Sequence, residues 1–170
     1  MTSTFEDTAK NRADAAAEPT VPAPARRINL MDKAPDFHQA MYALDKAARA
    51  GLDPVVRELV RVRTSQLNGC AYCVDKHAAD ARALGLTEQK LYGVTVWRET
   101  PFFTARERAA LALAEEVAEL GRHGVSEAVY AEAAGLFDEE ELPRLIAVCV
   151  TMNAWNRIGV TSRLSPELRG

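Results

Sequence analysis

The sequence predicts an all-α fold of about six to eight helices. From Pro35 onward apolar residues recur at helical spacing, glycines and prolines fall between the periodic segments, and alternating strand-like runs are missing. At 170 residues, the chain is long enough to bury a substantial core as one domain. We therefore expect a helical domain over residues 28–170 and a separate N-terminal tail over residues 1–27.

The expected tail differs from the domain in composition. Residues 1–27 are rich in alanine, threonine, proline and charged side chains, and they show no apolar period. Such a segment cannot bury enough apolar surface to offset the entropy of ordering it. We expect it to be disordered or loosely docked.

Three helices are predicted in the first half of the domain. Asp53 is a suitable N-cap because Pro54 follows it at the first helical position. Gly51 and Gly85 provide stops after the first and third helices. The predicted helices cover residues 36–50, 53–67 and 70–85.

Four more helices are predicted in the second half. Thr104 and Glu107 have the spacing of a capping box, and Ser126 is a suitable N-cap. Pro143 is tolerated because it falls in the first turns of the last helix. The predicted helices cover residues 87–96, 104–121, 126–135 and 138–159.

The last predicted helix is apolar on most of its sides, between Leu142 and Ile158. A helix of this kind lies in the centre of a protein or is shared between subunits. Cys149 falls within this apolar run, so we expect it to be a small core residue without a catalytic role.

Composition excludes several classes of function. The net charge of −3 gives no basic surface for nucleic acid, and no apolar run is long enough to cross a bilayer. The N-terminal residues lack the apolar stretch of a secretory signal, and three cysteines do not form a secreted disulfide framework. We expect a cytoplasmic protein, in which a close cysteine pair is catalytic or metal-binding rather than a permanent cross-link.

That cysteine pair is the most informative local feature. Cys70 and Cys73 follow the turn signal Asn68-Gly69, and His77 stands one helical turn after the second cysteine. At ~100° per residue the three side chains share one face of a helix. Positions i and i+3 are close enough for a disulfide, and a helix start favours the thiolate.

Three interpretations of this constellation remain open at the level of the residues. The favoured one is redox catalysis by a dithiol. The second is a zinc site that uses Cys70, Cys73 and His77 with a carboxylate as fourth ligand, although the second ligand pair of most zinc modules is missing. The third is two buried cysteines beside a core histidine.

The constellation also extends to a glutamate on the preceding helix. Glu58, eleven residues, Cys70-x-x-Cys73, three residues and His77 form a pattern that resembles the alkylhydroperoxidase AhpD-like proteins of the carboxymuconolactone decarboxylase superfamily. The sequence is also similar at residues 59–73, 97–99 and 106–111, and the similarity spans roughly residues 35–162.

The resemblance implies an AhpD-like helical bundle that assembles as a homotrimer or homohexamer. It further implies a thiol-dependent hydroperoxide reductase without cofactor or metal. By this resemblance Cys73 attacks the peroxide, Cys70 closes the disulfide, and Glu58 and His77 form a proton relay. A lipoyl-bearing or thioredoxin-like protein then supplies electrons as the external dithiol. Nucleic acid and membrane are not expected partners.

Two other functions stay open as alternatives. One is a metal-binding or structural oligomer of the same fold. The other is a decarboxylase that acts on a lactone by acid–base chemistry. Relatives of that second kind work without paired thiols, so the retained Cys-x-x-Cys argues against it.

Three further expectations concern the surroundings of the dithiol. Cys70 is nearer the helix end, so we expect it to lie nearer solvent than Cys73. Tyr72 replaces a histidine of some relatives; it points ~160° away from Cys70 on a helical wheel and is predicted to be a packing residue. Four aromatic residues are expected in the core rather than around a substrate pocket: Trp97, Phe102, Phe103 and Trp155.

Overall fold

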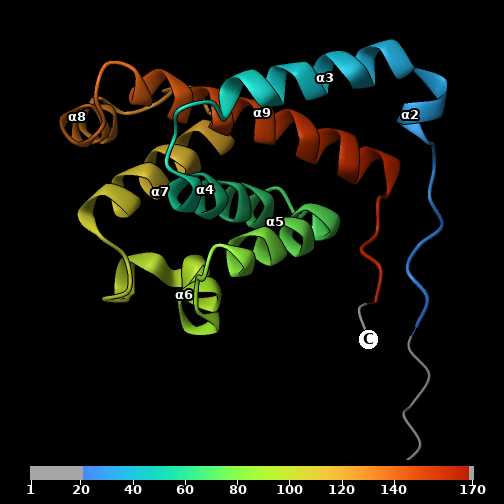
Figure 1. Ribbon diagram of the computed structural model, residues 1–170, viewed down its shortest axis with the longest axis horizontal. Helices are drawn as coiled ribbons and strands as arrows, with labels where there is room; N and C mark the ends of the chain where they lie inside the picture. The colour runs from blue at the N-terminus through green and yellow to red at the C-terminus, as the bar shows by residue number, and fades with distance from the viewer. Residues whose placement is uncertain (1–20, 169–170) are drawn as a thin grey trace, which may run out of the picture.

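The computed structural model describes residues 21–168, and every regular element within that range is a helix (Figure 1). The predicted all-α class is confirmed. The elements are α2 (Leu30–Lys33), α3 (Pro35–Ala48), α4 (Pro54–Leu67), α5 (Ala71–Ala83), α6 (Glu88–Gly93), the 3-10 helix η1 (Val94–Glu99), α7 (Ala105–Ala118), α8 (Glu127–Leu136) and α9 (Glu141–Ser162).

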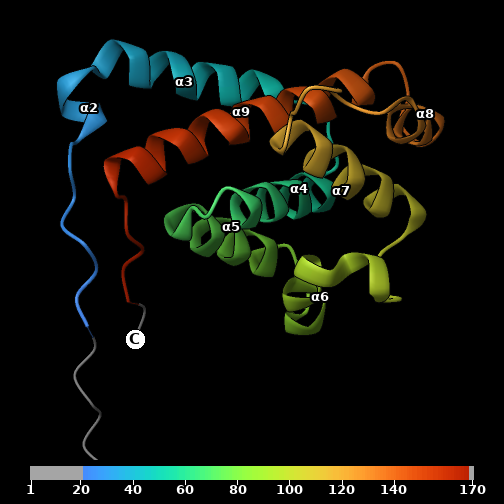
Figure 2. The same ribbon diagram turned by 180° about the vertical axis from the view of Figure 1, so that it is seen from behind.

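Of the predicted tail, residues 1–20 lie outside the described part of the chain. Residues 21–29 form neither helix nor strand. The Arg27 N–H donates to the carbonyl oxygen of Ser162 at 3.0 Å, so this segment runs beside the residues that follow α9 (Figures 1 and 2). Within residues 21–168, no helix has the length and apolar character that crossing a membrane requires.

Three predicted helix starts are confirmed by their caps. The Asp53 carboxylate accepts the Val56 N–H at 2.9 Å at the start of α4. Thr104 and Glu107 form a complete capping box at α7, and the Ser126 hydroxyl accepts a backbone N–H at α8. Each cap satisfies a backbone donor that the first helical turn leaves unpaired.

The structure differs from the prediction at three places. A short helix, α2, begins after Asn29, whose side chain accepts a backbone N–H. The helix predicted over 87–96 is divided into α6 and η1, with non-helical torsion angles at Val96. The last helix begins at Glu141 rather than Asp138, because the Asp138 carboxylate caps the N–H groups of Glu140 and Glu141.

The core is built around α4, which packs against α5, α7 and α9. Figures 1 and 2 show α3 lying along α9 on one side of the molecule, with α4, α5 and α7 on the other side of α9. Cys149 is completely buried in the larger core cluster, as predicted. Trp97 and Phe103 are buried in a second cluster, with Phe102 packed against it, which confirms the core expectation for these three rings.

The long helix α9 is only partly covered by this chain. Leu145, Val148 and Met152 are buried, whereas Val150 and Val160 remain exposed. The central burial expected for the last helix is therefore seen on one side. The prediction that a partner subunit covers another side rests on these exposed residues.

Candidate active site

The cysteine pair is placed at the start of α5 by a tight turn. Gly69 adopts a positive φ of 66°, which lets the chain reverse after α4, and the Cys70 N–H donates to the Ser65 carbonyl at 3.0 Å. Cys70 is the N-cap of α5 and Cys73 lies in its first turn. Their Cα atoms are 5.3 Å apart and the two sulfurs form a disulfide. The geometry predicted from the i, i+3 spacing is confirmed.

Both sulfurs are covered. Cys70 is 1% exposed and Cys73 5%, so the expectation that Cys70 lies nearer solvent is wrong. The cause is α9, which packs across the start of α5 and brings Met152 and Trp155 against the cysteines. Cys70 nevertheless lines a small cavity of about 210 Å³, together with Gly69, Ala71 and residues of the segment after α9.

A glycine is the point at which α9 approaches the disulfide. A Cβ atom on Gly159 would lie 2.9 Å from the Cys70 sulfur and 3.6 Å from the Cys73 sulfur. The first distance is shorter than van der Waals contact permits. The helix can therefore lie this close to the dithiol only because position 159 has no side chain.

This contact gives a direct prediction. We expect Gly159→Ala to destabilise the oxidised protein by about 1–3 kcal/mol, the usual cost of overpacking a core, measured by denaturant unfolding without reductant. Gly135→Ala is the matched control, because position 135 lies in the last turn of α8 and a Cβ there meets nothing within 4 Å. The control should not lose stability, and its gain should stay below the ~0.5–1 kcal/mol typical of Gly→Ala in the middle of a helix. Equal stabilisation of both variants would contradict the crowding argument.

Asparagines fix the turn before Cys70 to α9. The Asn68 side-chain amide donates to the side-chain oxygens of Asn153 at 2.9 Å and Asn156 at 3.0 Å. The amide of Asn156, which is fully buried, donates in turn to the Ser65 hydroxyl at 3.0 Å. The turn that carries Cys70 is thus tied to α9 as well as to α4. Sequence reasoning missed this network, although two asparagines inside an apolar helix were a visible signal.

Glu58 and His77 meet beside the dithiol. The α4–α5 hairpin folds back so that His77 Nδ1 lies 2.9 Å from Glu58 Oε2, which places together the two residues that the resemblance paired. Glu58 is 1% exposed and His77 is buried as well. Glu58 is therefore not the solvated surface charge that its arginine-rich helix alone would suggest.

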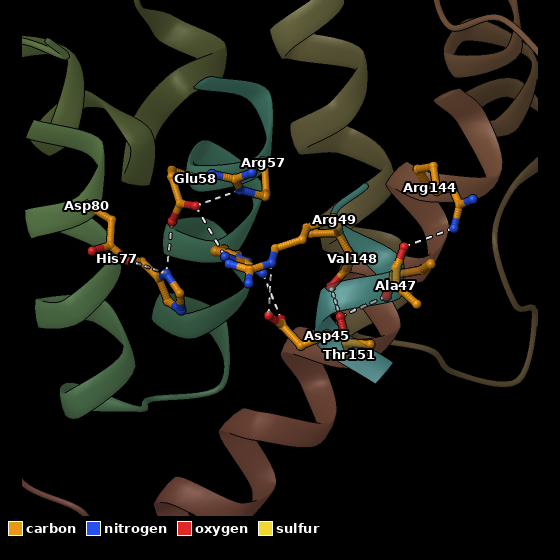
Figure 3. Close-up of polar contacts among 12 residues, drawn as sticks. Asp45, Ala47, Arg49, Arg57, Glu58, His77, Asp80, Arg144, Val148 and Thr151 are labelled. Atoms are coloured by element: carbon orange, nitrogen blue, oxygen red, sulfur yellow. Dashed lines mark hydrogen bonds and ion pairs between the residues drawn. The ribbon is translucent and has the colours of Figure 1, made fainter. Parts of the chain in front are cut away.

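The other oxygen of Glu58 is held by two arginines (Figure 3). Glu58 Oε1 accepts from Arg57 Nε at 2.8 Å and from Arg61 Nη1 at 3.2 Å. Arg61 also donates to the carboxylate of Asp45 on α3 at 2.7 Å. Both oxygens of the buried carboxylate are thus engaged, one by guanidinium groups and one by imidazole.

These contacts decide the charge of Glu58. Burial by itself would raise its pKa, but hydrogen bonds from His77 and Arg57 and the positive charge of Arg61 outweigh burial and lower the pKa to about 2. Glu58 is ionised at neutral pH and can only accept a hydrogen bond. A neutral His77 therefore carries its proton on Nδ1, which leaves Nε2 as a proton acceptor.

His77 lies one turn after Cys73 on the same face of α5. Within residues 21–168, no hydrogen bond joins His77 to either sulfur. The two sulfurs are bonded to each other, so neither has a proton to donate. The arrangement supplies a buried carboxylate, an oriented imidazole and a dithiol along one helix face.

A cavity of about 1120 Å³ opens beside this relay. Glu58 and His77 contribute to one part of its lining, and Tyr42 and Trp155 to another. Tyr72 also lines it and is 38% exposed, so the predicted packing role is wrong. Trp155 also departs from the prediction, since it borders the cavity rather than lying inside the core.

The only metal-ligand cluster among the described residues differs from the zinc set considered above. Glu58, His77 and Asp80 bring ligand atoms within 4.8 Å of one another, whereas the cysteines are bonded to each other. Arg57 and Arg61 already occupy one oxygen of Glu58, and their charge opposes a cation. The donor set fits a proton relay better than a metal site.

Comparisons with known proteins agree with this arrangement. Residues 35–116, which include Glu58, both cysteines and His77, match the carboxymuconolactone decarboxylase family. The uncharacterized protein YdfG of Bacillus subtilis is 34% identical over 137 residues, which cover 80% of this chain and 93% of YdfG. The chain belongs to the carboxymuconolactone decarboxylase family. The match to YdfG covers more of the chain than the family model does.

Solved structures with AhpD-related names share the fold of this chain. The protein of unknown function ATU0492 from Agrobacterium tumefaciens, named as a candidate antioxidant defence protein AhpD, superimposes with a TM-score of 0.82 at 32% identity, covering 85% of this chain and all of that one. An uncharacterized peroxidase-related protein from Ralstonia eutropha with an alkylhydroperoxidase AhpD core gives a TM-score of 0.71 at 27% identity, covering 81% and 74%. The fold of this family member is AhpD-like, as the resemblance implied.

Proposed function

We propose that the protein is a thiol-dependent hydroperoxide reductase in which Cys73 reacts with the peroxide and Cys70 completes the disulfide. One observation carries the proposal: a disulfide at the start of α5 lies beside a buried, ionised Glu58 that orients His77. The names of the two structural relatives, one antioxidant and one peroxidase-related, support the same chemistry.

The proposed cycle balances in three steps. The Cys73 thiolate attacks the terminal oxygen of ROOH, the O–O bond breaks, and ROH leaves with one proton while Cys73 becomes a sulfenic acid. The Cys70 thiol then condenses with it, forming the S–S bond and releasing water. An external dithiol reduces this disulfide by exchange and is itself oxidised to a disulfide.

His77 and Glu58 have complementary parts in this scheme. His77 Nε2 accepts the Cys73 proton and later supplies it to the departing oxygen. The carboxylate of Glu58 holds Nδ1–H and stabilises the imidazolium that forms meanwhile. Arg57 and Arg61 keep that carboxylate ionised. The positions of these four side chains support general acid–base catalysis at the Cys73 thiol.

The small cavity at Cys70 supports its assignment as the cysteine that exchanges with the donor. Cys70 lines this cavity and Cys73 does not, although Arg163 and Leu164 also border it. A lipoyl-bearing or thioredoxin-like protein is the proposed class of donor, because both present a reactive dithiol. Attack at Cys70 would release the Cys73 thiolate for the next cycle.

Exposed apolar residues support the proposed homotrimer or homohexamer. Phe37 and Leu44 on α3 and Val150 and Val160 on α9 are each more than a third exposed. Burial of such residues against other copies removes apolar surface from water.

The alternative of a lactone decarboxylase is less well supported. Glu58 and His77 alone would suffice for acid–base chemistry, but α9 is shaped around a pair of sulfurs that such chemistry does not use.

Mass spectrometry of the intact protein tests the proposal. Reduced protein treated with one equivalent of cumene hydroperoxide should lose the mass of two hydrogens, and this loss should map to the peptide that contains Cys70 and Cys73. Cys149 should stay reduced, because burial raises its pKa to about 12. An unchanged mass, or oxidation confined to Cys149, would refute the proposed chemistry.

A further inference from the structure

We infer that the large cavity binds a hydroperoxide that carries an aromatic group, and that His38, Tyr42 and Trp155 form the wall that receives this group. The inference rests on the proposed function and names the substrate class for the same site. We call these three residues the aromatic wall.

The aromatic wall is formed by two helices, α3 and α9. The ring centroids of His38 and Tyr42 are 4.8 Å apart, and those of Tyr42 and Trp155 are 5.3 Å apart. The His38 and Trp155 centroids are 5.6 Å apart, with the rings nearly perpendicular. All three rings line the large cavity. Aromatic rings prefer edge-to-face and offset contacts, so the ring of a ligand can make the same kind of contact with this wall.

Trp155 connects the aromatic wall to the reacting sulfurs. Its side chain packs against the cluster of Cys70, Cys73 and Met152 while it also lines the large cavity. The relay residues Glu58 and His77 line the same cavity. Neither sulfur lines this cavity, so a ligand whose ring rests on Trp155 is one side chain away from the dithiol, and it shares its cavity with the proton relay.

The size of the cavity favours an organic substrate. At about 1120 Å³ it is slightly larger than the ~300–1,000 Å³ usual for small-molecule sites and far larger than hydrogen peroxide needs. Tyr42 is 59% exposed, so much of this ring is available for contact. Among residues 21–168, neither the Tyr42 hydroxyl nor the Trp155 indole N–H has a hydrogen-bond partner. The rings of the aromatic wall offer apolar faces, and their O–H and N–H groups can donate hydrogen bonds to the oxygen atoms of a ligand.

Substitution of Tyr42 tests this assignment. Tyr42→Ser should raise KM for cumene hydroperoxide by about 3- to 10-fold, the scale of one aromatic contact, while kcat and the kinetics with hydrogen peroxide stay unchanged. His38→Ser should act in the same direction. Tyr130→Ser is the matched control, since Tyr130 on α8 is 43% exposed and lies outside the cavity. It should leave both peroxides unaffected.

Other outcomes separate this inference from its alternatives. Equal changes for both peroxides, or none, would overturn the aromatic wall as a substrate site. A change in assembly size at unchanged KM, seen by light scattering, would reassign the wall to a subunit interface. If the wild type consumes neither peroxide, the proposed function fails. Calorimetric binding of 2-phenyl-2-propanol, weakened by Tyr42→Ser, would then still support the site, and absence of binding would overturn it.

Discussion

Replacement of Cys73 by serine is expected to reduce peroxide consumption to the rate measured without protein. The proposed cycle depends on a thiolate at this position, and a serine hydroxyl at neutral pH is neither ionised nor able to form a sulfenic acid. The assay is consumption of cumene hydroperoxide with a synthetic dithiol as donor. No residual route is expected, because Cys149 is completely buried and its pKa is raised to about 12.

Cys70→Ser should behave differently from Cys73→Ser. Without the dithiol donor, which would itself reduce a sulfenic acid, it should consume one equivalent of peroxide and stop as a sulfenic acid on Cys73, detected by a dimedone adduct. Cys149→Ala is the control and should keep full turnover. If Cys70→Ser consumes no peroxide and Cys73→Ser accumulates a sulfenic acid, the roles of the two cysteines are reversed. Unchanged turnover in Cys73→Ser would remove the dithiol mechanism altogether.

The parts of the site that the sequence predicted are those set by spacing along one helix or one hairpin. The i, i+3 relation of Cys70 and Cys73 fixes their Cα separation, and the i, i+4 relation places His77 on the same face. The short α4–α5 connection returns Glu58 to His77. In each case a local geometric rule leaves few alternatives.

The parts that were missed depend on contacts distant in sequence. No residue near Cys70 in the sequence indicates that α9 covers it. From the sequence, Gly159 is expected to end a helix, whereas in the structure its missing side chain lets α9 approach the Cys70 sulfur. The exposure of Tyr72 also depends on which neighbours α5 has, not on its own periodicity. Whether Trp155 is buried in the core or borders the cavity depends on the position of α3. Such features follow from packing between helices, which a single-helix pattern does not encode.

Glu58→Gln is expected to slow turnover by roughly 10²- to 10⁴-fold, the range typical of a general acid–base group. A neutral amide does not stabilise the imidazolium that forms when His77 takes the thiol proton. Glu115→Gln is the matched control. Glu115 is also buried, where burial raises its pKa but hydrogen bonds from Trp97, Arg98 and Arg63 outweigh it and lower the pKa, and neither it nor these partners line the large cavity. It should lose stability without a comparable loss of turnover.

Glu58→Gln should also change how the free energy of unfolding depends on pH. The pKa of Glu58 is about 2 in the folded protein against 4.5 for the free side chain, so its ionisation stabilises the fold fully above about pH 4.5. This contribution is lost as pH falls through the window from 4.5 to about 2. Denaturant unfolding across that window should show a shallower acid loss for Glu58→Gln than for the wild type. Equal slopes would mean that Arg57 and Arg61 do not hold Glu58 ionised, and the oriented imidazole would lose its physical basis.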